Sequence, residues 1–130
     1  MARAATAVAR PRRPKSKGVP LSQEVRRRLE WLTGILGSNR VAELLGVSRS
    51  QPSRWRAGIE GLAARNARAV LDLDYVVARL HQLWTPDVAA MWLESPNAHL
   101  GGAVPLNVLR LRGPGEVIQA IDAEYEGAYA

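Results

Sequence analysis

The sequence predicts an all-α protein, and three observations support this fold class. Apolar residues recur at helical spacing, as in the series Val25, Leu29, Leu32 and Leu36. Capping residues and glycines divide the chain into segments of helix length. No segment alternates between apolar and polar residues over the four to eight positions that are typical of a half-buried strand.

The first half of the chain is expected to form three helices that end at glycines. The first begins at the N-cap Ser22 and runs to about Leu36, where the sequence Gly37-Ser38-Asn39 ends it. The second covers about 40–45, with Val41, Leu44 and Leu45 inward, and Gly46 closes it. The third covers about 50–57 and is followed by Gly58 and Gly61.

A long helix is expected from about Leu62 to Trp84. Its apolar stripe comprises Val70, Leu73, Val77, Leu80 and Trp84, widened by Val76 and Leu83. Thr85-Pro86-Asp87 starts the next helix, because a hydroxyl cap, a proline in the first turn and an acid near the helix N-terminus all favour a helix start.

The last part of the chain has breaks at regular intervals. Proline forces the preceding residue out of the helical conformation, so Ser95-Pro96 ends a helix, and Asn97 can cap the next turn. Gly101-Gly102, a helix led by Pro105 and the break Gly113-Pro114-Gly115 follow. An amphipathic helix then ends at Gly127. Its apolar face is Val117, Ile118, Ile121 and Tyr125, and Glu116, Asp122, Glu124 and Glu126 are expected outside.

Residues 41–55 carry the pattern of a helix-turn-helix. Such a motif needs a small residue where its helices touch and a glycine at the turn, and Ala42 and Gly46 supply them. The internal apolar residues would be Val41, Leu45, Val47 and Trp55. An ordinary helical hairpin is the alternative interpretation.

If the motif binds DNA, the N-terminal and outward residues of its second helix would face base edges. These are Arg49, Ser50, Gln51, Ser53 and Arg54, while Arg56 and the run Arg26-Arg27-Arg28 are better placed for phosphates. Pro52 departs from the pattern, because a helix interior needs the amide that proline lacks. It is tolerated only in a first turn, so the recognition helix would begin as late as Ser50.

Charge is distributed unevenly along the chain. The formal net charge is +6, and residues 1–19 contain six basic side chains and no acidic one. Residues 20–69 hold nine basic and four acidic residues, whereas residues 70–130 hold three and eight. A basic first half favours polyanion binding, and the acidic second half favours a different partner. Residues 1–19 are expected to be a disordered tail that adds phosphate contacts, with a solvated tail or a transit peptide as alternatives.

The composition argues against several other classes of protein. There is no Cys, no apolar run long enough to span a membrane and no secretory signal, so we expect a cytoplasmic protein. His81 and His99 lack partners for a metal site, and Asp72 and Asp74 point to different faces of one helix. We therefore expect no catalytic residue, no metal and no cofactor, and hence no enzyme.

An ordered set of residues resembles the C-terminal toxin-binding domain of the Xre/MbcA/ParS antitoxins, the partners of RES-domain toxins that destroy NAD. The set is Trp92-Leu93, Ser95-Pro96-Asn97, Leu100-Gly101, Pro105, Leu109, Gly113, Val117, Ile118, Ile121, Asp122, Glu126-Gly127 and Tyr129. The resemblance implies an antitoxin that binds a RES-domain toxin and operator DNA, acts as a homodimer and regulates its own transcription. The toxin-binding residues would be Trp92, Asn97, Ile121, Tyr125, Gly127, Ala128, Tyr129 and Ala130, with the last four entering the toxin's NAD site.

The resulting prediction has four parts: a basic tail at 1–19, a helix-turn-helix region at 20–61, a connecting helix at 62–85 and a toxin-binding domain at 86–130. Core packing alone is an alternative role for Ile118 and Ile121, and a frayed end is an alternative for the last residues. Two other functions also stay open. They are a stand-alone helix-turn-helix repressor, and a protein-binding module whose DNA-binding motif has degenerated around Pro52.

Overall fold

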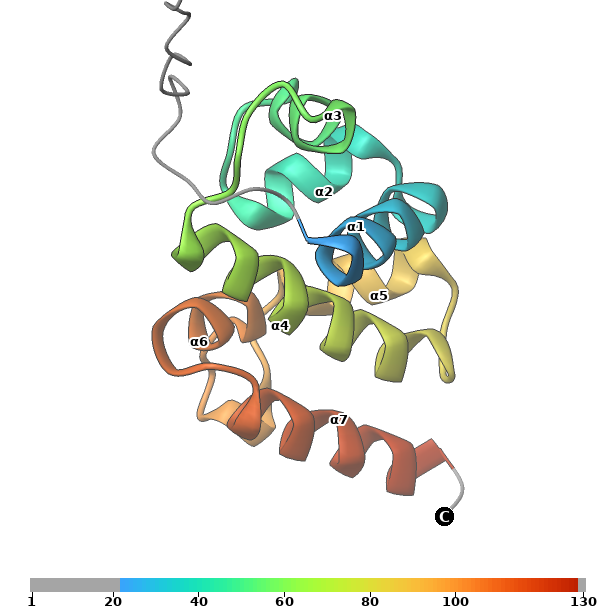
Figure 1. Ribbon diagram of the computed structural model, residues 1–130. Helices are drawn as coiled ribbons and strands as arrows, with labels where there is room; N and C mark the ends of the chain where they lie inside the picture. The colour runs from blue at the N-terminus through green and yellow to red at the C-terminus, as the bar shows by residue number, and fades with distance from the viewer. Residues whose placement is uncertain (1–21, 129–130) are drawn as a thin grey trace, which may run out of the picture.

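A computed structural model describes residues 22–128, which form seven α-helices and one short 3-10 helix (Figure 1). In chain order they are α1 (Gln23–Leu36), α2 (Ser38–Leu45), α3 (Gln51–Ala57), α4 (Ala64–His81), α5 (Pro86–Leu93), η1 (Ala98–Leu100), α6 (Pro105–Arg112) and α7 (Gly115–Ala128). The all-α class predicted from the sequence is confirmed. The predicted tail at 1–19 lies outside the described residues.

Local chemistry sets the start of several helices. The Ser22 hydroxyl accepts a hydrogen bond from the Val25 amide at 3.1 Å, and the Thr85 hydroxyl accepts one from the Val88 amide. Both satisfy an amide that the first turn of a helix leaves without a backbone partner. Pro86 and Pro105 occupy first turns, where their missing amide costs nothing. The predicted starts of α1, α5 and α6 are therefore correct.

The predicted bounds of the second helix and of the long helix are wrong. The second helix begins at Ser38 instead of Arg40, because Gly37 takes φ +90° and its carbonyl already accepts the Val41 amide. The long helix covers only Ala64–His81 instead of 62–84. Leu62 lies before it and is still fully buried. Trp84 follows it in a turn, and the Trp84 amide donates to the Leu80 carbonyl.

Helix α4 lies in the middle of the fold. It packs against α1, α2 and α5 on one side and against α6 and α7 on the other, as Figure 1 shows. Its buried residues Val70, Leu73, Val76, Val77 and Leu80 join one apolar cluster with side chains of α1, α2, α3, α5, α6 and α7. The N-terminal and C-terminal halves of the described chain therefore share a single core, and the division into four parts stays a prediction.

The C-terminal helix differs from the expectation at its end. A stop at Gly127 was predicted, but α7 continues through Gly127 to Ala128. A glycine inside a helix costs only about 1 kcal/mol relative to alanine, so a helix that is held elsewhere can pass through it. Tyr129 and Ala130 lie outside the described residues. Within residues 22–128, no helix is both long and apolar enough to cross a membrane.

Candidate functional site

Helices α2 and α3, for which a helix-turn-helix was predicted, are joined by residues 46–50. Gly46 adopts φ +73°, a left-handed conformation that glycine tolerates best, and the Val47 amide bonds back to the Ala42 carbonyl at 2.9 Å. Ala42 is buried. Val41 and Trp55 are also buried, and Leu45 and Val47 pack against the core.

Pro52 occupies the first turn of α3, the one place where the sequence could accommodate it. α3 begins at Gln51, so Pro52 is its second residue and its ring is buried. Proline here replaces the branched apolar residue expected at this position without removing a helical hydrogen bond. The resulting helix has seven residues, which limits its surface for a partner.

The candidate DNA-binding residues differ in how accessible they are. Arg49, Ser50, Ser53 and Arg54 are exposed, whereas Gln51 and Arg56 are half-buried. The Gln51 amide donates to Glu60 at 2.5 Å, and the Arg54 guanidinium lies 3.6 Å from the same carboxylate. Glu60 was not among the residues predicted from the sequence, although an acid three residues after a basic helix is a visible signal. This carboxylate therefore partly neutralises the charge of Arg54 and also engages the Gln51 amide.

The arginine run on α1 is largely engaged within the chain. Arg27 and Arg28 both pair with Glu24 at 2.7 Å, and Arg28 also pairs with the buried carboxylate of Asp74 on α4. Hydrogen bonding and charge from Arg28 lower the pKa of Glu24, and the hydrogen bond to Asp74 raises the pKa of Arg28. The run therefore links α1 to α4 as well as presenting positive charge.

In the C-terminal half, Glu124 of α7 points inward, contrary to the expectation that it lies outside. Its Oε2 atom accepts hydrogen bonds from Trp92 Nε1 at 2.9 Å and from Asn97 Nδ2 at 3.2 Å. Asp122, also expected outside, pairs with Arg79 of α4. Helix α7 packs along α4 and η1. Asp122 therefore holds α7 to α4, and Glu124 holds it to Trp92 of α5 and to Asn97 before η1.

The predicted toxin-binding residues fall into three groups. Trp92 and Asn97 direct their polar atoms to Glu124. Ile121 is 0% exposed, so it packs α7 onto the core and cannot contact a partner directly. Tyr125 is 38% exposed and Gly127 is exposed on the last turns of α7. Ala128 ends that helix, and Tyr129 and Ala130 lie outside the described residues.

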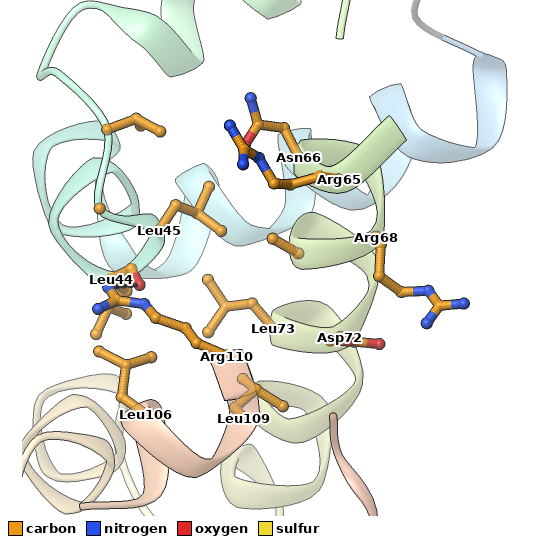
Figure 2. A pocket seen from close by; sticks show the side chains of 13 residues that line it. Leu44, Leu45, Arg65, Asn66, Arg68, Asp72, Leu73, Leu106, Leu109 and Arg110 are labelled. Carbon is orange, nitrogen blue, oxygen red and sulfur yellow. Dashed lines mark hydrogen bonds between the residues drawn. The ribbon is translucent and has the colours of Figure 1, made fainter. Parts of the chain in front are cut away.

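A cavity of about 570 Å³ lies where α2, α4 and α6 meet (Figure 2). Leu45, Leu73, Leu106 and Leu109 line its centre, and Figure 2 shows Arg65 and Asn66 together at one end, with Arg68 directed away. Burial raises the pKa of Asp72 on its wall. This cavity could not be predicted from the sequence, because its walls come from segments far apart in the chain.

Arg110 joins the two halves of the protein at this cavity. From α6 its guanidinium donates to the Leu44 carbonyl at 2.6 Å and to the Glu43 carbonyl at 3.5 Å. These carbonyls end α2, where a helix leaves acceptors without partners and favours a positive charge. A Cβ atom on Gly46 would lie 3.3 Å from Arg110 Nη2. A side chain of the C-terminal half thus supports the turn between α2 and α3.

Residues 79–127 match the sequence profile of the antitoxin Xre/MbcA/ParS C-terminal toxin-binding domain. The resemblance predicted from the sequence is confirmed. The mycobacterial cidal antitoxins MbcA of Mycobacterium bovis and Mycobacterium tuberculosis are 29% identical over 89 residues, which cover 68% of this chain and 79% of theirs. The matched segment begins in the last turn of α4, before the predicted boundary at residue 86.

The fold is also similar to a chain of the crystal structure of the M. tuberculosis MbcT–MbcA toxin–antitoxin complex. The TM-score is 0.66 at 26% identity, and the likeness covers 84% of this chain and all of the other. Because it covers 84% of this chain, the likeness extends into both halves of the fold described above.

Proposed function

We propose that this protein is an antitoxin that binds and neutralises a RES-domain, NAD-degrading toxin, and that it catalyses no reaction itself. The observation that carries the proposal is the match of residues 79–127 to a toxin-binding domain. The similarity of the whole fold to a chain of a toxin–antitoxin complex supports it. Inhibition would be steric, with residues 127–130 entering the NAD site of the toxin.

The exposed end of α7 is the surface best suited to this role. Tyr125 offers an aromatic side chain next to exposed Glu126 and Gly127, and the proposed contact continues through Ala128, Tyr129 and Ala130. Aromatic side chains commonly anchor protein interfaces, because one ring buries a large area with few rotatable bonds. Trp92 and Asn97 would support this surface from beneath through Glu124.

The proposal is tested by co-expression with a RES-domain toxin, co-purification and measurement of NAD consumption. Deletion of residues 128–130 is expected to leave the complex intact and to restore NAD consumption, because most of the contact area lies upstream. Tyr125→Ala should weaken co-purification, whereas Tyr75→Ala, which truncates a 49% exposed tyrosine on α4, serves as the matched control. Full protection of NAD by the truncated protein would show that the docked domain covers the pocket mouth instead.

We also propose that the turn between α2 and α3 binds operator DNA and that the protein regulates its own transcription as a homodimer. The proposal is supported by the left-handed Gly46 turn, by exposed Arg49 and Arg54, and by the excess of basic residues in the first half. One short recognition helix buries too little surface for tight binding, so two copies are needed.

Arg49→Ala should weaken operator binding by about 1–3 kcal/mol if Arg49 reads guanine. Fluorescence anisotropy on operator and scrambled duplexes measures this loss, and Arg112→Ala on α6 controls for the change in net charge. Equal losses on both duplexes would make Arg49 a phosphate contact. Absence of binding by the wild type at low salt would favour the protein-binding module. DNA binding without any toxin partner would favour the stand-alone repressor.

A further inference from the structure

Polar contacts of Glu124 help to hold the end of α7. Val117, Ala120 and Ile121 are buried and fasten the first part of the helix to the core. Beyond Ile121, the residues Tyr125, Glu126 and Gly127 are exposed. Glu124 lies in this last part, one turn beyond the last buried apolar residue.

Glu124 contacts two different elements through one oxygen atom. Its Oε2 accepts from the Trp92 indole of α5 at 2.9 Å and from the Asn97 amide, which precedes η1, at 3.2 Å. Hydrogen bonds to an ionised acceptor are about twice as strong as neutral ones. These three side chains, Trp92, Asn97 and Glu124, are called the Glu124 clamp.

Both donors of the clamp are themselves fixed. Asn97 is 8% exposed, and its Oδ1 atom accepts the His99 amide at 2.8 Å, which sets the orientation of its Nδ2 donor. Its backbone amide and carbonyl bond to Ala103 and Gly102. The Trp92 ring lies against Trp84, with 6.3 Å between ring centroids. Glu124 is therefore anchored to two rigid points.

We propose that Glu124 is a positioning residue for toxin neutralisation, which directs the last turn of α7 without contacting the toxin. This inference rests on the proposed function, in which residues 127–130 enter the toxin. Loss of the clamp would let the end of α7 sample several directions, so fewer molecules would present it correctly. Inhibition would then weaken more than docking does.

The geometric part is tested on the protein alone. The chain contains no cysteine, so Met91→Cys on α5 and Gly127→Cys on α7 accept a pair of spin labels at defined sites. Met91 is 63% exposed, and a side chain at Gly127 meets nothing within 4 Å. Glu124→Ala should broaden the distribution of distances between the labels. Glu126→Ala, which removes an exposed acid from the same helix, should leave it unchanged.

A conservative variant shows whether the hydrogen bonds of Glu124, its charge or its contribution to folding determines the position of the α7 end. Glu124→Gln keeps an oxygen that can accept both hydrogen bonds, so its distance distribution should stay narrow. Trp92→Phe keeps an aromatic side chain, although a smaller one, and removes one donor, so it should broaden the distribution less than Glu124→Ala. Circular dichroism should show unchanged helix content in all variants. A narrow distribution in Glu124→Ala would overturn the clamp.

The functional part is tested with the unlabelled variants and a RES-domain toxin. Glu124→Ala should still co-purify, with inhibition of NAD consumption weakened about tenfold, which corresponds to about 1.4 kcal/mol. Glu124→Gln should restore inhibition to within about threefold of wild type. Unchanged inhibition by Glu124→Ala, or failure of Glu124→Gln to restore it, would overturn the positioning role. A wild-type protein that binds no such toxin would overturn the proposed function and this role together. The distances between the labels would still show whether the Glu124 clamp holds the end of α7.

Discussion

Substitution of Gly46 tests whether the C-terminal half supports the turn between α2 and α3. Gly46→Ala places a Cβ atom on a residue with φ +73°, and this atom would lie 3.3 Å from Arg110 Nη2. The left-handed conformation costs a non-glycine residue about 1–2 kcal/mol. The guanidinium must also move, which weakens its 2.6 Å hydrogen bond to the Leu44 carbonyl, a bond worth about 1 kcal/mol net.

We therefore expect Gly46→Ala to lower the free energy of unfolding by about 2–3 kcal/mol in the wild type. In an Arg110→Ala background the hydrogen bond is already absent, so only the backbone cost of about 1–2 kcal/mol remains. The difference, about 1 kcal/mol, is the coupling energy between the two sites. A protein of this size should lose about 4 °C of melting temperature for each kcal/mol.

The assay is urea unfolding of the wild type, Gly46→Ala, Arg110→Ala and the double variant. Circular dichroism at a fixed salt concentration follows the unfolding. Gly34→Ala on α1 is the control, because a Cβ atom there meets nothing within 4 Å and the backbone is helical. It should be neutral or slightly stabilising. The same cost for Gly46→Ala with and without Arg110 would refute the coupling between α6 and the turn.

Three further predictions concern single side chains. Glu60→Gln should strengthen DNA binding about two- to fivefold in fluorescence anisotropy, because it removes the carboxylate that holds Gln51 and Arg54; an unchanged affinity would place this face away from DNA. Partial desolvation and the neighbouring Glu43 raise the pKa of Glu94 above its ordinary value of 4.5, so the native state binds more protons there and stability falls as pH rises through the window above 4.5. Glu94→Gln should therefore stabilise the protein at pH 7 but not below pH 4.5 in thermal unfolding, and equal effects at both pH values would contradict this origin. Ile121→Ala should lower the free energy of unfolding by about 2–5 kcal/mol. A variant of unchanged stability that no longer binds the toxin would show instead that Ile121 contacts the toxin.

Local interactions explain why most helix starts could be predicted. An N-cap acts within three residues and a proline acts on its own turn, so Ser22, Thr85, Asn97 and Pro105 each specify a start without help from the rest of the fold. Pro52 also acts locally, because its missing amide restricts it to the first turn of a helix wherever α3 lies in the fold.

Contacts between distant residues explain most of what could not be predicted. The pattern of its own helix predicts that Glu124 faces solvent. It instead accepts hydrogen bonds from Trp92 and Asn97, which lie about thirty residues earlier. Arg110 meets Leu44 across more than sixty residues. No local pattern encodes either pair, because each depends on how α6 and α7 pack on α4.

The amino-acid sequence by itself determined the all-α class, the Gly46 turn, the capped helix starts and the resemblance of the last third to a toxin-binding domain, since each rests on neighbouring residues or on an ordered set of them. Only the tertiary structure decided that Ile121 belongs to the core, that Glu60 restrains the exposed face of α3 and that the two halves share one core. The physical reason is the same in each case. Burial and pairing depend on which surfaces meet, and packing of the whole chain selects those surfaces.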